Sequence, residues 1–82
     1  MNVEFAKTIA KRFYWGHDSN AQIAQDLSIN KNTVARIRKV CKDLKWVDDL
    51  SEKRIARCAQ EHHVSKSVIR AIYPVARDHR YR

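Results

Sequence analysis

Glycine and proline are almost absent from this chain of 82 residues, which contains one of each. Because the turns of β-hairpins depend on these residues, their scarcity argues against an all-β fold and favours helices. Long apolar runs are also missing: none approaches the ~18 residues that a membrane-spanning helix needs, and the N-terminus has no secretion signal. Since 44% of the residues are hydrophobic, a folded core is still expected. The sequence predicts an all-α protein that is cytosolic or nucleoid-associated.

Cysteine is scarce as well, and the spacing of Cys41 and Cys58 matches no disulfide framework. Free thiols in a reducing compartment fit these residues best. A zinc site needs four ligands in tetrahedral geometry, and these cysteines with His62 and His63 have no recognised spacing. The chain also lacks a glycine-rich phosphate loop and a nucleophile–base pair. We therefore expect no metal, no cofactor, no small-molecule effector and no enzymatic activity.

Acidic residues are outnumbered by basic ones, nine to seventeen, which gives a net charge of +8. The excess is not confined to a tail, because residues 1–46 carry nine basic and four acidic residues and residues 47–82 carry eight and five. A basic excess spread over a small domain indicates a polyanionic partner. Nucleic acid is the first candidate and an anionic membrane surface the second, while a merely solubilising surface charge is the alternative.

An amphipathic helix is predicted near the N-terminus. Phe5, Ile9 and Phe13 recur at intervals of four residues and form one apolar stripe. Gly16 follows, and we expect it to end the helix in the left-handed conformation that glycine adopts freely.

Two further helices are predicted in the first half of the chain. Ser19 and Gln22 have the spacing of a capping box, which begins a short helix of about two turns. Asn30 is expected to cap a longer one. The apolar stripe of this longer helix has spacings of three, four and three residues: Val34, Ile37, Cys41 and Leu44.

The second half predicts two more helices after a connection over residues 46–50. Ser51 is expected to cap the fourth helix and Ser65 the fifth. Pro74 is expected to end the fifth helix or to start a new turn, since it has no backbone N–H. Residues 77–82 are expected to form a frayed basic tail. About five short helices result, in an N-terminal unit of residues 1–46 and a second unit of residues 47–76.

The stretch from Ile23 to Ile37, IAQDLSINKNTVARI, combines two helices with a three-residue turn. Ala24 is the small residue where the helices cross, and Ile29 is the aliphatic residue in the turn. The remaining aliphatic positions are Ile23, Leu27, Val34 and Ile37. In this spacing the chain resembles the bacterial and phage helix-turn-helix family, and with the preceding helix it resembles homeodomain-like repressors, resolvases and transposase DNA-binding domains. It departs from the family at Ser28, where glycine is common, at a cost of about 1 kcal/mol.

The resemblance implies that the helix after Asn30 enters the major groove of double-stranded DNA with its first residues against the base edges. It assigns five residues to the bases: Asn30, Lys31, Asn32, Ala35 and Arg36. It assigns a second set to the phosphates: Gln22, Thr33, Arg38, Lys39 and Lys42. For the lysines near the end of this helix, a solvated helix face is the alternative.

A second, degenerate copy of the motif is suggested by a repeat at an offset of 35 residues, since AQDLSINKNTVARIRKV aligns with AQEHHVSKSVIRAIYPV. Its weak points are His62, where the first copy has Leu27, and His63 in the turn. In this second DNA-reading motif, or second head, the residues facing the major groove of DNA would be Ser65, Lys66, Ser67 and Arg70. If both heads read DNA, a monomer could span two groove segments; otherwise helices four and five cover the core or form a homodimer on a palindromic site.

The function expected from the resemblance is a small repressor of transcription that works by occupancy, in the cytoplasm of a bacterium or of the host of a phage or plasmid. One alternative is a DNA-binding adaptor that recruits a larger partition, recombination or packaging assembly. Another is a protein-interaction module that uses its charge for acidic partners. Family analogy alone carries the connection to mobile elements.

Overall fold

Five α-helices and one π-helical turn make up the computed structural model, which describes residues 2–81. The elements in chain order are α1 (Val3–Lys11), η1 (Arg12–Gly16), α2 (Asn20–Leu27), α3 (Lys31–Leu44), α4 (Glu52–His62) and α5 (Lys66–Arg80). The described residues contain no strand, so the prediction of an all-α fold with five helices is confirmed.

Each α-helix begins after an Asn or Ser in extended conformation. The side-chain oxygen of this residue accepts a hydrogen bond from a backbone N–H in the first turn, which would otherwise lack a partner. The capping residues are Asn2, Ser19, Asn30, Ser51 and Ser65. Four of these five starts were predicted from the sequence, because capping depends on residues that are close along the chain.

Gly16 does not take the left-handed conformation, so that prediction is wrong. α1 runs into η1, whose wider turn moves the end of the helix by one residue, and His17 has the positive φ of 57°. Gly16 instead permits a close approach, because a Cβ atom there would lie 2.9 Å from Oδ2 of Asp18. That carboxylate accepts a hydrogen bond from Nε of Arg12 at 2.9 Å.

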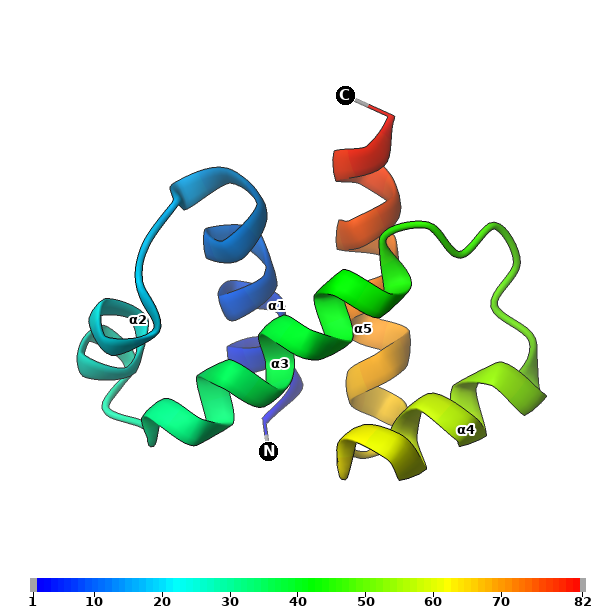
Figure 1. The fold of residues 1–82 in the computed structure, drawn as a ribbon, viewed down its shortest axis with the longest axis horizontal. Coiled ribbons are helices and arrows are strands. Elements are labelled where there is room, and N and C mark those ends of the chain that lie inside the picture. The colour runs from blue at the N-terminus through cyan, green and yellow to red at the C-terminus, as the bar shows by residue number, and fades with distance from the viewer. Residues whose placement is uncertain (1, 82) are drawn as a thin grey trace.

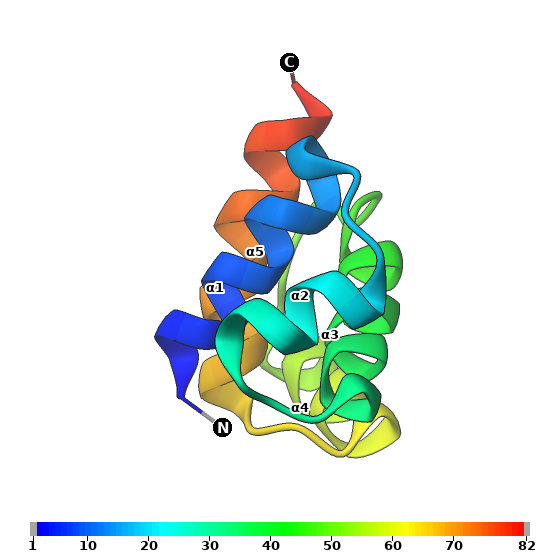
Figure 2. The ribbon, with the colours of Figure 1, turned by 90° about the vertical axis from the view of Figure 1, so that its left-hand side faces the viewer.

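The five helices share one core. α1 and α5 run side by side in the same direction, and α3 crosses both of them (Figure 1). Turning the molecule places α1 and α5 on one side and α3 on the other (Figure 2). The fully buried large side chains come from all three of these helices and from α2: Ile9, Ile23, Val34, Ile37, Val40, Cys41, Leu44, Val68, Ile69 and Ile72. The two predicted units are therefore packed together through α5.

Pro74 does not end α5, and the tail is not frayed; both expectations are wrong. The helix continues to Arg80 because Ile72 and Ala76, on either side of the proline, are fully buried and hold the backbone against the core. Arg80 is also fixed, since it forms an ion pair of 3.1 Å with Asp48 in the connection before α4. Only residue 82 of the predicted tail lies outside the described residues.

A buried hydrogen bond joins η1 to α3. The hydroxyl of Tyr14 donates to the carbonyl oxygen of Cys41 at 2.6 Å. Burial raises the pKa of Tyr14 well above its usual value, and burial also raises the pKa of the Cys41 thiol to about 12. Both groups therefore stay neutral in the folded protein under physiological conditions.

We expect the protein to lose stability at alkaline pH because of Cys41. The thiol ionises near pH 9 in the unfolded chain but only near pH 12 in the fold, so the unfolded state alone gains from deprotonation in between. Cys41 alone should lower the free energy of unfolding by about 1.4 kcal/mol for each pH unit in this window, and Tyr14, whose pKa is also raised by burial, adds to the fall above pH 10. Urea denaturation at several pH values above 8 measures the slope. Cys41→Ala should make it shallower, and equal slopes in both proteins would contradict this assignment.

Candidate nucleic-acid interface

The predicted turn between α2 and α3 is formed by residues 28–30. Ser28 has a left-handed backbone, with φ 55° and ψ 45°, and ends α2. The next amide, that of Ile29, donates to the carbonyl oxygen of Ala24 at 3.0 Å. Asn30 then returns to an extended conformation and caps α3. This backbone path joins two helices through a tight bend, as the spacing in the sequence predicted.

The apolar positions of the motif lie inside. Ile23, Val34 and Ile37 are fully buried, and Ala24 is nearly so. Leu27 and Ile29 are partly buried and pack against the same core. These contacts fix the direction of α3 relative to α2, and the opposite face of α3 is left to solvent.

The residues predicted to face the bases lie on that solvent-exposed face. Asn30, Lys31, Asn32 and Arg36 are exposed and Ala35 is half-buried. The side-chain oxygen of Asn30 accepts from the Asn32 amide at 2.7 Å, so it is already used in the cap. Within residues 2–81, the side chains of Lys31, Asn32 and Arg36 have no hydrogen bond or ion pair. The structure thus presents three donor-bearing side chains together at the start of α3.

The residues predicted to contact phosphates are less uniform. Lys39 and Lys42 are exposed, whereas Thr33 is half-buried. Gln22 is exposed and donates from its side chain to Asp26, one turn further along α2, at 3.0 Å. Arg38 is engaged inside the protein: its guanidinium group donates to the side-chain oxygen of Asn20 and lies 4.9 Å from the centre of the Phe13 ring. Arg38 therefore joins α3 to α2 and η1.

Arg12, a residue to which the sequence assigned no role, holds α2 in place. Nε of Arg12 lies 2.9 Å from Oδ2 of Asp18, and Nη2 lies 2.7 Å from Oδ2 of Asp26. Hydrogen bonds with Asp26 and then Asp18 raise the pKa of Arg12. One side chain thus joins the start of η1 both to the segment before α2 and to the last turn of α2. No short-range pattern in the sequence indicates this arrangement.

The turn between α4 and α5 repeats the geometry of the first turn. His63 has φ 55° and ψ 43°, close to the values of Ser28. The amide of Val64 donates to the carbonyl oxygen of Ala59 at 3.1 Å, and Ser65 caps α5. The backbone therefore repeats at the same offset of 35 residues as the sequence.

The side chains of the second turn depart from the first. His62, at the position of Leu27, forms an ion pair with Asp43 on α3 when it is protonated. Arg70 lies 3.1 Å from both carboxylate oxygens of Glu52, so its guanidinium group is already engaged. Ser65, Lys66 and Ser67 remain exposed. The side-chain oxygen of Ser65 is used in the cap of α5, so Lys66 and Ser67 are the two of the four predicted residues that are free to face a partner.

Both turns border one hollow of about 480 Å³, which lies between the start of α3 and the start of α5. Its walls include Ile29, Thr33 and Arg36 from the first motif. The second motif contributes His63, Val64 and Ser65. The two turns therefore lie on the same side of the molecule (Figure 1).

One group of possible metal ligands exists among residues 2–81. Ligand atoms of Asp43, Glu61 and His62 lie within 4.8 Å of one another. Both carboxylates are exposed, and the histidine already contacts Asp43. Cys41 and Cys58, which the sequence analysis weighed as ligands, do not belong to this group.

No helix within residues 2–81 has the length and hydrophobicity to cross a membrane. In comparisons with known proteins, no family model matches the chain, and no curated protein or solved structure shows significant similarity to it.

Proposed function

We propose that the chain is a sequence-specific DNA-binding protein of the helix-turn-helix type, with α3 in the major groove. The observation that carries this proposal is the start of α3: a capped helix after a tight turn, with Lys31, Asn32 and Arg36 exposed and unpaired within the described chain. The net charge of +8 supports a polyanionic partner. As a small regulator, the protein would repress transcription by occupying its site.

The exposed residues have the chemistry for reading bases. The amide of Asn32 can pair with N6 and N7 of adenine, and the guanidinium group of Arg36 can pair with O6 and N7 of guanine. Ala35 offers a methyl group to the C5-methyl of thymine. Lys39 and Lys42, further along α3, supply charges for phosphates without reading sequence.

The dimensions of the molecule favour one groove for each chain. Equivalent positions in successive major grooves are ~34–36 Å apart, whereas the Cα atoms of the described structure extend over 34 × 28 × 17 Å. The two turns border one hollow, so they are much closer together than the ends of the molecule. We therefore propose that α3 reads one half-site, that Lys66 lies beside the flanking phosphates, and that two chains bind a palindrome.

Selection of DNA from a random pool tests the proposal. We expect a short palindromic sequence, a complex with the mass of two chains, and an affinity that falls steeply with salt. Each phosphate contact should contribute a slope of about −0.9 to the log–log plot. A pool that yields no preferred sequence would overturn the DNA-binding proposal in favour of a protein-interaction module. A long footprint with one chain would show instead that both heads read DNA.

An adaptor that recruits a larger assembly is the second candidate function. It is favoured by a groove between α1 and α5. These two helices lie on the opposite side of the molecule from α3 (Figure 2), which leaves room for a protein partner while α3 binds DNA. Repression without any partner in a reporter assay would favour the regulator over the adaptor.

A further inference from the structure

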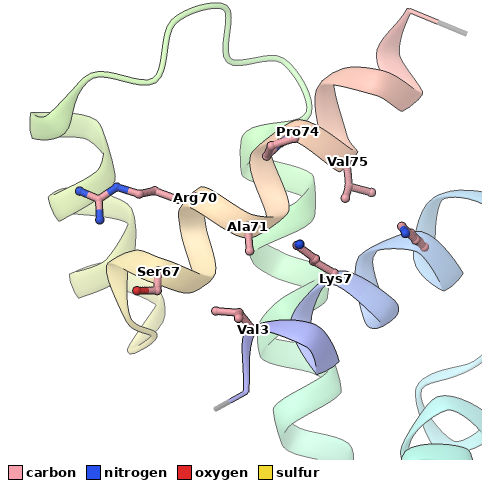
Figure 3. Close-up of a pocket in the computed structure, with 8 residues that line it drawn as sticks. Val3, Lys7, Ser67, Arg70, Ala71, Pro74 and Val75 are labelled. Carbon is pink, nitrogen blue, oxygen red and sulfur yellow. The ribbon is translucent and has the colours of Figure 1, made fainter.

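A groove runs between α1 and α5, and α3 passes behind these two helices in the view of Figure 3. It consists of two hollows of about 630 and 570 Å³ in a line. The hollows are continuous because both are bordered by Lys11, Pro74 and Val75. The groove is on the side of α1 and α5, opposite α3 (Figure 2), and its lining includes Ser67 and Arg70, two of the residues predicted for the second head.

The lining of the groove is apolar in the middle and basic at the border. Val3, Ala71, Pro74 and Val75 form its floor and walls, as Figure 3 shows. Two cationic side chains of α1, Lys7 and Lys11, border this floor, whereas the side chain of Arg70 extends away from it toward α4, where it pairs with Glu52 (Figure 3). At the far end Trp15 borders the second hollow and is 42% exposed. One acidic residue, Asp78, lies at the same end.

Pro74 gives this surface a feature that the core does not need. Its ring is exposed at the groove, so it adds little to the buried interior. Within a helix, proline removes the hydrogen bond to the carbonyl four residues earlier, here that of Arg70, and costs about 3 kcal/mol relative to alanine. The residue therefore shapes the groove at the expense of stability.

We propose that this groove binds an amphipathic α-helix of a partner protein whose apolar stripe is bordered by acidic residues. From Ser67 to Asp78 the groove follows α5 for about 16 Å at the helical rise of 1.5 Å per residue, which matches about three turns of a bound helix. Two hollows in line can take two apolar side chains from neighbouring turns. The proposal is independent of DNA binding.

The charges of the groove favour an acidic amphipathic helix over a second copy of this chain and over a nucleic acid. Lys7 and Lys11, both on α1, complement acidic side chains along one border of a bound helix; Lys11 has no partner within residues 2–81, and Lys7 has an exposed ion pair with Glu4 at 3.7 Å. A second copy of the chain has the same net charge of +8, so it matches this cationic border less well than an acidic helix does; the two chains proposed on a palindrome are brought together by DNA and do not need this groove. A nucleic acid backbone would satisfy the cations but would leave the apolar floor uncovered.

Peptide binding tests the proposal directly. Trp46→Phe leaves Trp15, at the end of the groove, as the only tryptophan and hence as the fluorescent reporter. The probes are two designed peptides of about 14 residues with leucine at positions i, i+3, i+4 and i+7: one has glutamate on both borders of the stripe, and the other has lysine there. We expect the acidic peptide to bind at least about tenfold more tightly at low salt, and the difference to shrink as salt rises.

Charge reversal supplies the matched control. Lys7→Glu with Lys11→Glu should reverse the preference of the protein toward the lysine peptide. Lys53→Glu with Arg57→Glu changes the net charge equally on α4, outside the groove, and should leave the preference unchanged. Circular dichroism checks the fold of both variants. Equal binding of the two peptides, the absence of a saturable signal up to about 1 mM, or an equal effect of both double variants would overturn the proposal.

Discussion

Replacing Asn32 and Arg36 together with alanine should lower the affinity for the selected DNA sequence by about 100-fold, while binding to random DNA weakens only severalfold. Each bidentate contact with a base is worth ~1–3 kcal/mol of discrimination, and the exposed side chains of both residues are free to form one. Alanine preserves the helix, because its helix propensity is at least as high as that of either residue. Competition binding with labelled selected DNA and unlabelled random DNA measures both affinities.

The matched control lies on the same helix. Lys39→Ala with Lys42→Ala removes two charges that are proposed to contact phosphates, so it should weaken binding to both DNAs equally and reduce the salt slope by about two contacts. If the Asn32 and Arg36 double variant behaves in the same way as this control, the two residues do not read bases. For Arg36→Ala alone, we expect a loss of ~1–3 kcal/mol on selected DNA and a relaxed preference at one base pair.

Pro74→Ala should stabilise the fold by about 2 kcal/mol. Removing the proline restores the N–H that α5 lacks and relieves the clash with the preceding turn, which together are worth about 3 kcal/mol. The greater freedom of alanine in the unfolded chain offsets about 1 kcal/mol of this gain. The midpoint of thermal unfolding should rise by about 8–15 °C, since 1 kcal/mol shifts it by ~4–8 °C in a domain of this size.

Arg77→Ala is a suitable comparison for the proline variant, because Arg77 is exposed on the same helix. Its effect on the free energy of unfolding should stay within about 0.5 kcal/mol. A loss of stability in Pro74→Ala would mean that the proline ring contributes more to packing than the restored hydrogen bond returns.

The parts of the fold that the sequence predicted are those set by residues close along the chain. The caps at Ser19, Asn30 and Ser51 involve partners two or three residues away. The wrong prediction at Pro74 concerns a place where contacts with distant residues override a local rule, and the one at Gly16 concerns a helix whose last turn is wider than an α-helical turn. Burial of Ile72 and Ala76 carries α5 past its proline, and the wider turn of η1 moves the left-handed residue to His17.

At the candidate interface, too, the sequence predicted the features set by neighbouring residues and missed those set by distant ones. Spacing alone predicted the turn at Ser28 and the repeated turn at His63, and the backbone has the expected bend at both. The pairing of Arg70 with Glu52 and of Arg38 with Asn20 joins residues eighteen positions apart, which no periodicity indicates. Two of the cations counted toward DNA binding are therefore engaged within the protein.

The parallel packing of α1 against α5 also determines when the protein can fold during synthesis. Along the chain, α2, α3 and α4 all lie between α1 and α5, although α1 and α5 contact each other in the fold. The apolar side chains of α1 that α5 helps to bury, Ala6, Ile9 and Ala10, therefore remain partly exposed until α5 has left the ribosome. At ~5–20 residues per second the nascent chain spends several seconds in this state. Helical proteins of this size usually fold through contacts between sequence neighbours. Here the last step is a long-range one, and a nascent chain bearing an exposed apolar helix is the species that chaperones would meet.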